Sequence, residues 1–257
     1  MSRITAILSW QYASPEVRSA EFRKFAAAQI LSNRRHLADI GLYHGNIDLH
    51  GYEANGIDLF ARSVIERDSD DDEAVDATFK MMTSISNAAK GAIPSGLLFH
   101  RACGERVRAT LLKEAWVSGK SGSVLALNGG SRTRIASYFR EVDQRHLMEQ
   151  DEIDALASMK ETVTIYRGAK LKDGSIRKTA FALSWTREYK TARRFGLHGH
   201  GNTQGVVLRA EVPKTAVLAL WETSGAEPEV VVDPRRVRSL SMAELIDPAE
   251  ERAAYAA

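Results

Sequence analysis

The chain has almost no cysteine, because Cys103 is the one thiol among 257 residues. One thiol cannot build a disulfide framework or a cysteine-based zinc site, so the fold must be held together by packing. A single cysteine on a helical stretch is typical of a small buried side chain. The histidines show no ligand spacing for zinc, and we expect no metal.

The sequence also lacks a strong charge of either sign. Lys and Arg number 35 against 33 Asp and Glu, a formal net charge of +2, which argues against a large nucleic-acid or membrane footprint. We recognise no signal peptide and no segment long enough to span a membrane. The expected location is the cytoplasm, either of the cell that makes the protein or, if it is injected, of a target cell.

Apolar periodicity predicts helices along most of the first 160 residues. Ser14 and Pro15 form a helix start, a capping residue followed by proline in the first turn. Segment 42–56 carries several turn signals and is expected to be a loop. The predicted helices cover 15–41, 57–67, 74–90, 103–117, 132–148 and 151–159. Residues 1–95 are expected to form a helical N-terminal region.

Two polar stretches invite a ligand-binding interpretation but fit local structure better. The acidic run Asp68–Glu73 lacks the glycine and the distal glutamate of a helix-loop-helix calcium site, so we expect a solvated turn that caps the next helix. Gly119-Lys120-Ser121 looks like the end of a phosphate-binding loop, but Glu114 stands where that loop needs its first glycine. We expect a flexible connection there.

From Thr162 onward the pattern changes from helical to strand-like. The predicted strands are TVTIYRG, TAFALSW, GVVLRAEV, AVLALW and EVVVD. One helix interrupts them, from Thr186 to Phe195, with Ala192 and Phe195 on one face. The chain is therefore expected to be α+β, with helices first and a mixed β-sheet in the second half.

Polar residues stand at the ends of the first two of these strands. Arg167 ends the first strand, and its planar, permanently charged guanidinium suits a phosphate or a diphosphate. Gly168, which follows, allows a turn or the close approach of another backbone. Ser184 ends the second strand, and Thr186 is well placed to cap the helix after it.

An acidic pair precedes the last predicted strand. Glu227 and Glu229 are two residues apart, so they lie on the same face of an extended chain. Two such carboxylates repel each other unless a cation or a hydroxyl group lies between them. Beside an arginine and a serine, this pair suits a phosphate-bearing sugar and the stabilisation of a developing cation at its anomeric carbon.

The ordered set of these motifs resembles a known family. Arg in YRG, Ser-x-Thr ahead of a helix in FALSWTREYKTARRFG, and Glu-x-Glu ahead of a valine run in EPEVVVD are similar to the Arg–Ser–Glu class of mono-ADP-ribosyltransferases. That class includes bacterial toxins, phage-encoded transferases and vertebrate ecto-enzymes. The resemblance covers 162–233 and implies that residues 96–257 form a catalytic domain with an ADP-ribosyltransferase-like core.

The resemblance also implies a role for each matching residue. Glu229 would stabilise an oxocarbenium-like transition state, and Glu227 would position or deprotonate the acceptor. Arg167 would hold the phosphates of NAD, which is a substrate, and Ser184 would orient the catalytic glutamate. A glutamate at position 227 is associated in the family with a protein arginine as the acceptor. The NAD-binding residues implied in this way are Arg167, Gly168, Ser184, Trp185, Thr186 and Phe195.

The chain departs from the family pattern in two places. In the Ser-Thr-Ser motif of the family, Trp185 stands in place of the threonine and Thr186 in place of the last serine. Loop 196–205 has the glycine content of the family's nicotinamide-covering loop, but it lacks the aromatic residue that packs on the nicotinamide in the family. His198 or His200 could take that stacking role. Trp221 lies in the segment that recognises the target in the family, although a lone tryptophan equally suits a buried core.

Three alternatives stay open on the sequence alone. The chain could be an NAD glycohydrolase, with water as the acceptor, or a non-catalytic binding protein on the same fold. It could also transfer ADP-ribose to a nucleic acid or a small molecule. The near-neutral charge argues against a nucleic acid. The N-terminal helices could bind the target or a delivery partner, or simply cover the sheet.

Overall fold

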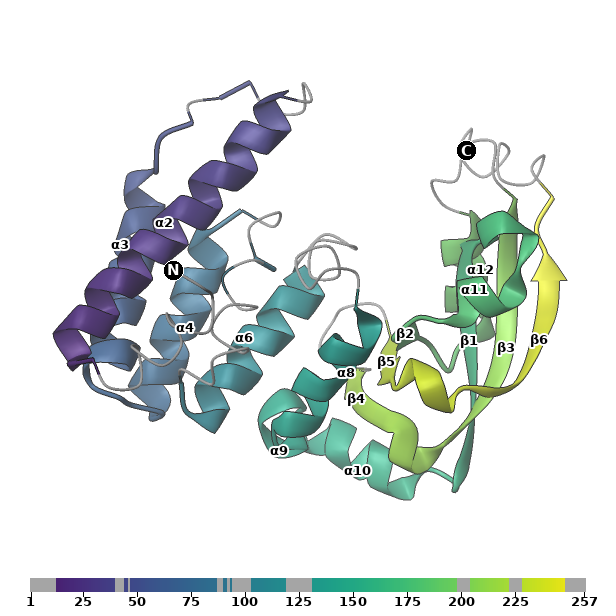
Figure 1. Cartoon of the computed structure of the whole chain (residues 1–257). Helices are drawn as coiled ribbons and strands as arrows, with labels where there is room; N and C mark the ends of the chain where they lie inside the picture. The colour runs from purple at the N-terminus through teal and green to yellow at the C-terminus, as the bar shows by residue number, and fades with distance from the viewer. Residues whose placement is uncertain are drawn as a thin grey trace. The chain divides into compact units, whose positions relative to one another are not determined.

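The computed structural model describes residues 13–39, 44–45, 47–86, 90–91, 93, 103–118, 131–197, 204–221 and 228–247. The chain forms two compact units, an N-terminal unit, Met1–Ser131, and a C-terminal unit, Arg132–Ala257. The described part of the N-terminal unit is helical, and the C-terminal unit combines helices with antiparallel strands (Figure 1). The expected α+β class is thus confirmed. The boundary between the two units lies after Ser131, whereas the sequence suggested a boundary between residues 95 and 96. Residues 105–118 belong to the first unit because their helix packs on the helix at 72–84.

The N-terminal unit begins with the long helix predicted at Ser14 and Pro15. Ser14 Oγ accepts a hydrogen bond from the backbone N–H of Val17 at 3.4 Å, and Pro15 is the first helical residue. The described elements of this unit are α2 (Pro15–Asp39), α3 (Gly51–Phe60), the π-helix η1 (Ala61–Glu66), α4 (Asp72–Ser84) and α6 (Glu105–Ser118). Their core contains the fully buried side chains of Phe22, Ile30, Phe60, Met81 and Leu111.

The loop expected at 42–56 is partly wrong, because α3 begins at Gly51. Glu53 explains this start. Its Oε2 accepts the backbone N–H of His50 at 3.0 Å, and its Oε1 pairs with Arg34 of α2 at 2.5 Å. Both side chains of the pair are buried, so α3 begins where a carboxylate meets the one buried arginine of α2.

The acidic run at 68–73 caps two helices, as the sequence predicted for one. Asp71 Oδ1 accepts the backbone N–H of Ala74 at 2.9 Å and so caps α4. Asp70 accepts the backbone N–H groups of Arg106 and Val107 at 3.0 and 2.8 Å, at the start of α6.

Cys103 packs against the hydrophobic core of the N-terminal unit. Burial raises the pKa of its thiol to about 12, which keeps the thiol protonated at neutral pH.

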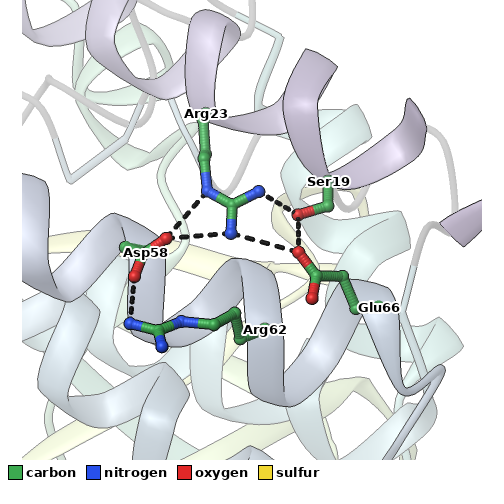
Figure 2. A network of polar contacts seen from close by, with 5 residues as sticks. All are labelled: Ser19, Arg23, Asp58, Arg62 and Glu66. Carbon is green, nitrogen blue, oxygen red and sulfur yellow. Dashed lines mark hydrogen bonds and ion pairs between the residues drawn. The ribbon is translucent and has the colours of Figure 1, made fainter. Parts of the chain in front are cut away.

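A polar network joins α2 to α3 and η1. Figure 2 shows Arg23 of α2 between two carboxylates, Asp58 and Glu66. Its guanidinium lies 2.8 Å from Asp58 Oδ1 and 3.1 Å from Glu66 Oε1 and also donates to Ser19 Oγ. Ser19 Oγ donates to Glu66 at 2.5 Å, and Arg62 pairs with the second oxygen of Asp58. Hydrogen bonds from Ser19 and from Arg23 lower the pKa of Glu66. Burial acts to raise the pKa of Asp58, but Arg23 and Arg62 outweigh it, so that the pKa of Asp58 is also lowered.

This network predicts an acid-labile N-terminal unit. A carboxylate whose pKa is lowered on folding stabilises the fold above its unfolded pKa and loses that contribution as the pH falls. The urea midpoint of the N-terminal unit should therefore fall as the pH is lowered from about 5 to about 2, and less steeply in Arg23→Gln. Lys24→Gln is the matched control, since Lys24 of the same helix pairs with the exposed Glu21 and lies outside this network. Equal pH dependence in wild type and Arg23→Gln would contradict the account.

Within its described residues, the C-terminal unit starts with three helices and continues with six strands, among which further helices and short turns lie. The helices and short turns are α8 (Arg132–Glu141), α9 (Gln144–Leu147), α10 (Gln150–Ser158), η2 (Lys172–Gly174), α11 (Ile176–Ala180), α12 (Tyr189–Leu197), η3 (Lys214–Ala216) and η4 (Pro234–Arg236). The strands are β1 (Thr162–Lys170), β2 (Ser184–Trp185), β3 (Gly205–Pro213), β4 (Val217–Trp221), β5 (Glu229–Val232) and β6 (Arg238–Leu245).

Most predicted strands are confirmed, but TAFALSW is largely wrong. Only Ser184 and Trp185 of that run are extended, because its first two residues belong to α11, which Ser175 caps through the N–H of Lys178 at 3.3 Å. The helix expected at Thr186–Phe195 runs instead from Tyr189 to Leu197. Strand β6 was not predicted, since most of its residues are exposed and it lacks a buried apolar face.

The strands form two antiparallel sheets, ordered β1-β3-β6 and β2-β5-β4. An isolated bridge between Tyr166 and Thr186 joins them through two backbone hydrogen bonds of 2.7 and 2.9 Å. Through this bridge the neighbours run β4-β5-β2-β1-β3-β6. Helix α12 packs on β1 and β3, and α8, α9 and α10 contact β4.

Gly168 provides the close backbone approach that the sequence suggested. A Cβ atom there would lie 1.6 Å from the Ala192 carbonyl oxygen and 2.4 Å from the Gly196 nitrogen, both in α12. Gly168→Ala should therefore lower the free energy of unfolding of the C-terminal unit by about 3 kcal/mol or more, or prevent folding. Gly174→Ala, at φ +67° with open space around it, should cost about 1 kcal/mol. Urea denaturation measures both, and equal losses would contradict the packing account.

Candidate functional site

Arg167 lies inside the C-terminal unit, on β1 opposite Leu208 of β3. One terminal nitrogen of its guanidinium donates to the backbone carbonyl of Ser184 at 2.5 Å. Its Nε is buried and has no hydrogen-bond partner among the described residues. Burial lowers the pKa of Arg167 to about 10, against the opposing effect of the Glu229 carboxylate, so the side chain still carries its charge at neutral pH.

Strand β2 lies between the strands of Arg167 and Glu229. Ser184 pairs with Val231 and Trp185 with Val230, both on β5. The indole of Trp185 is buried and donates to the Ala182 carbonyl at 3.0 Å. The predicted capping role of Thr186 is met in part, because its buried Oγ1 accepts the N–H of Glu188 at 3.1 Å in the turn before α12. Side chains at 185 and 186 thus serve the fold itself.

Glu229 is the first residue of β5 and pairs with Trp221 of β4. The negative charge of Glu229 acts to raise the pKa of Arg167, so the two side chains interact electrostatically. The structure therefore brings together Arg167, Ser184 and Glu229, on β1, β2 and β5. Glu227, the second acid of the expected pair, lies outside the described residues, as do His198 and His200 in loop 196–205.

Two aromatic residues named from the sequence have separate environments. Phe195 on α12 is 40% exposed, whereas Ala192 is fully buried, so the two do not share a buried face. Trp221 is 2% exposed, donates to the Leu147 carbonyl at 3.1 Å and lies with its ring 6.1 Å from that of Phe139. Trp221 is thus a core residue.

The sequence did not single out two cations near Arg167. Arg132, the first residue of α8, lies with its guanidinium carbon 5.9 Å from the ring centre of Phe181. Its charge lowers the pKa of Arg167, and the charges of both arginines, after burial, lower the pKa of Lys172. Arg132 and Lys172 belong to no motif, so only the folded chain shows that they lie near Arg167.

Two further properties are observed within the described residues. No helix there combines the length and the apolar character that crossing a membrane requires. No group of three or more His, Cys, Asp or Glu side chains in the described ranges could hold a metal ion.

Comparison of the chain with models of protein families, with curated proteins and with solved structures finds no match. A functional interpretation therefore depends on the residues of the C-terminal unit. A desolvated guanidinium with an unused donor suits an anionic oxygen, and a carboxylate beside it suits a developing positive charge.

A half-buried cation that serves a ligand should contribute little to folding. We expect Arg167→Met to change the free energy of unfolding of the C-terminal unit by less than about 1 kcal/mol, because desolvation of the charge offsets its hydrogen bond. Arg140→Met is the matched control: Arg140 pairs with the buried Asp233 at 2.5 Å, so its removal should cost about 2 kcal/mol. Equal losses in urea denaturation would make Arg167 a structural residue.

Proposed function

We propose that this chain is an NAD-dependent mono-ADP-ribosyltransferase that acts on a macromolecular acceptor, a protein arginine. One observation carries the proposal. Arg167, Ser184 and Glu229 stand on the neighbouring strands β1, β2 and β5, in the chain order of the family that the sequence resembles. The buried Nε of Arg167, unpartnered among the described residues, adds a donor that the fold does not use.

Each residue then has a chemical task. Arg167 binds the diphosphate of NAD, which matches the planar guanidinium and its unused donor. Glu229 stabilises the positive charge that develops on the ribose as the bond between its C1′ and nicotinamide breaks. The electron pair of that bond leaves with nicotinamide. The lone pair of the acceptor nitrogen forms the new bond to C1′, and that nitrogen loses a proton, which Glu227 takes.

The proposal predicts that chemistry depends on Glu229. With labelled NAD and a bacterial or eukaryotic lysate, the wild-type chain should transfer label to a macromolecule. Glu229→Ala should lower that rate by about 10²–10³-fold, because the main stabiliser of the transition state is lost. Glu211→Ala, which removes a carboxylate of β3 that bonds to Arg209, is the control and should keep the rate.

The other outcomes select between the alternatives. Free ADP-ribose that depends on Glu229, with no labelled macromolecule, would make the chain an NAD glycohydrolase. NAD turnover that is unchanged in Glu229→Ala would overturn the proposed catalytic role. No turnover in the wild type, and no protection by NAD in thermal melts, would favour a binding protein on this fold.

A further inference from the structure

Strand β6 is the last in the row β4-β5-β2-β1-β3-β6 of the described strands and lies at the edge of its sheet (Figure 1). It pairs with β3 along one edge, and no described strand pairs with its other edge. The backbone N–H and C=O groups along an unpaired edge bind the edge of another strand readily. Native proteins protect such edges with charged side chains, proline or bulges.

These devices protect β6 only in part. Two irregularities in the ladder with β3 and a positive φ at Ser239 distort the strand. However, β6 contains no proline, and its only charged residues are Arg238 and Glu244. Six of its eight residues are exposed, including Met242 at 47% and Leu245 at 45%. Exposed apolar side chains on an edge strand of low charge favour pairing with a further strand.

The two charged residues of β6 lie on the same face of the sheet. In the ladder, Arg238 pairs with Glu211 of β3, and Glu244 pairs with Val207 of the same strand. These two positions of β3 are four residues apart and therefore share a face. A second β6, antiparallel to the first and in register about Ser241, would set Arg238 of each strand opposite Glu244 of the other. Cross-strand pairs of opposite charge stabilise a sheet.

Both side chains are suited to such a pair. Arg238 is exposed and forms no ion pair with a described carboxylate. Glu244 is held in place by α12, because its carboxylate accepts the Tyr189 hydroxyl and, at 3.0 Å, the Arg193 Nε–H. Each carboxylate oxygen has a second lone pair, so Glu244 can accept a further donor.

We propose that β6 is a self-association surface, at which two copies of this chain pair antiparallel about a two-fold axis at Ser241. The same surface then serves both copies, as in the commonest kind of homodimer. Arg238 of each copy faces Glu244 of the other, and Leu240 faces the exposed Met242, which covers apolar surface. A second copy fits better than an unrelated strand, because β6 carries both members of the charge pair at equal distances from its centre. Dimerisation through β6 is independent of the proposed function.

Reversal of the two charges tests this dimer in sedimentation velocity of the full chain over a series of concentrations. The wild type should form dimers. Arg238→Glu and Glu244→Arg should each raise the dissociation constant about tenfold, because like charges then face each other. An equimolar mixture of these two variants should form dimers as the wild type does, since every facing pair again has opposite charges. Lys160→Glu, which reverses an exposed charge elsewhere in the unit, is the control and should keep the dimer.

Glu244→Arg also removes contacts with α12, so Met242→Lys provides a second variant at an exposed position. It should weaken the dimer by a similar factor and leave the urea midpoint of the monomer unchanged. A wild type that stays monomeric up to about 1 mM would overturn the proposal. A dimer that all three variants leave unchanged would place the interface elsewhere and would also overturn it. So would a monomer whose outward-pointing β6 amides are protected from hydrogen exchange, because another segment of the same chain would then cover the edge.

Discussion

The backbone bridge between Tyr166 and Thr186 is the constraint on which the arrangement of the site depends. Its two hydrogen bonds, of 2.7 and 2.9 Å, join one three-stranded sheet to the other. Arg167 follows Tyr166 directly, and Ser184 lies two residues before Thr186, so the bridge sets arginine beside serine. The pairing of β2 with β5 then brings the strand of Glu229 to the same place.

In the same region, folding desolvates a charged side chain, which costs free energy. Burial opposes the charge of Arg167, and Arg132 adds to that opposition, yet the described residues give its Nε no hydrogen-bond partner. In contrast, the buried carboxylate of Asp233 is bound by both Arg140 and Arg235. Arg167 thus differs from Asp233, although Arg18 and Arg108 of the N-terminal unit also have a buried Nε without a hydrogen-bond partner among the described residues.

Local signals in the sequence predicted much of the fold. Ser14, Pro15 and the acidic run at 68–73 mark helix starts, and β-branched alternation marks β1, β3, β4 and β5, because these features depend on near neighbours in the chain. The start of α3 and the strand β6 were missed, since the first depends on the ion pair between Glu53 and Arg34 and the second on pairing with β3. For the site, the motifs named Arg167, Ser184 and Glu229. Arg132 and Lys172 could not be named, because their relation to Arg167 exists only in three dimensions.

The central claim is that Arg167 offers its buried Nε–H to the diphosphate of NAD. Titrating the ¹⁵N-labelled chain with NAD and following the arginine Nε–Hε resonances by NMR tests this claim most directly. The resonance of Arg167, assigned by its absence in Arg167→Met, should shift with saturation by NAD, while that of the exposed Arg238 stays in place. An Arg167 resonance that is unchanged at saturating NAD, or a chain that does not bind NAD at all, would contradict the account.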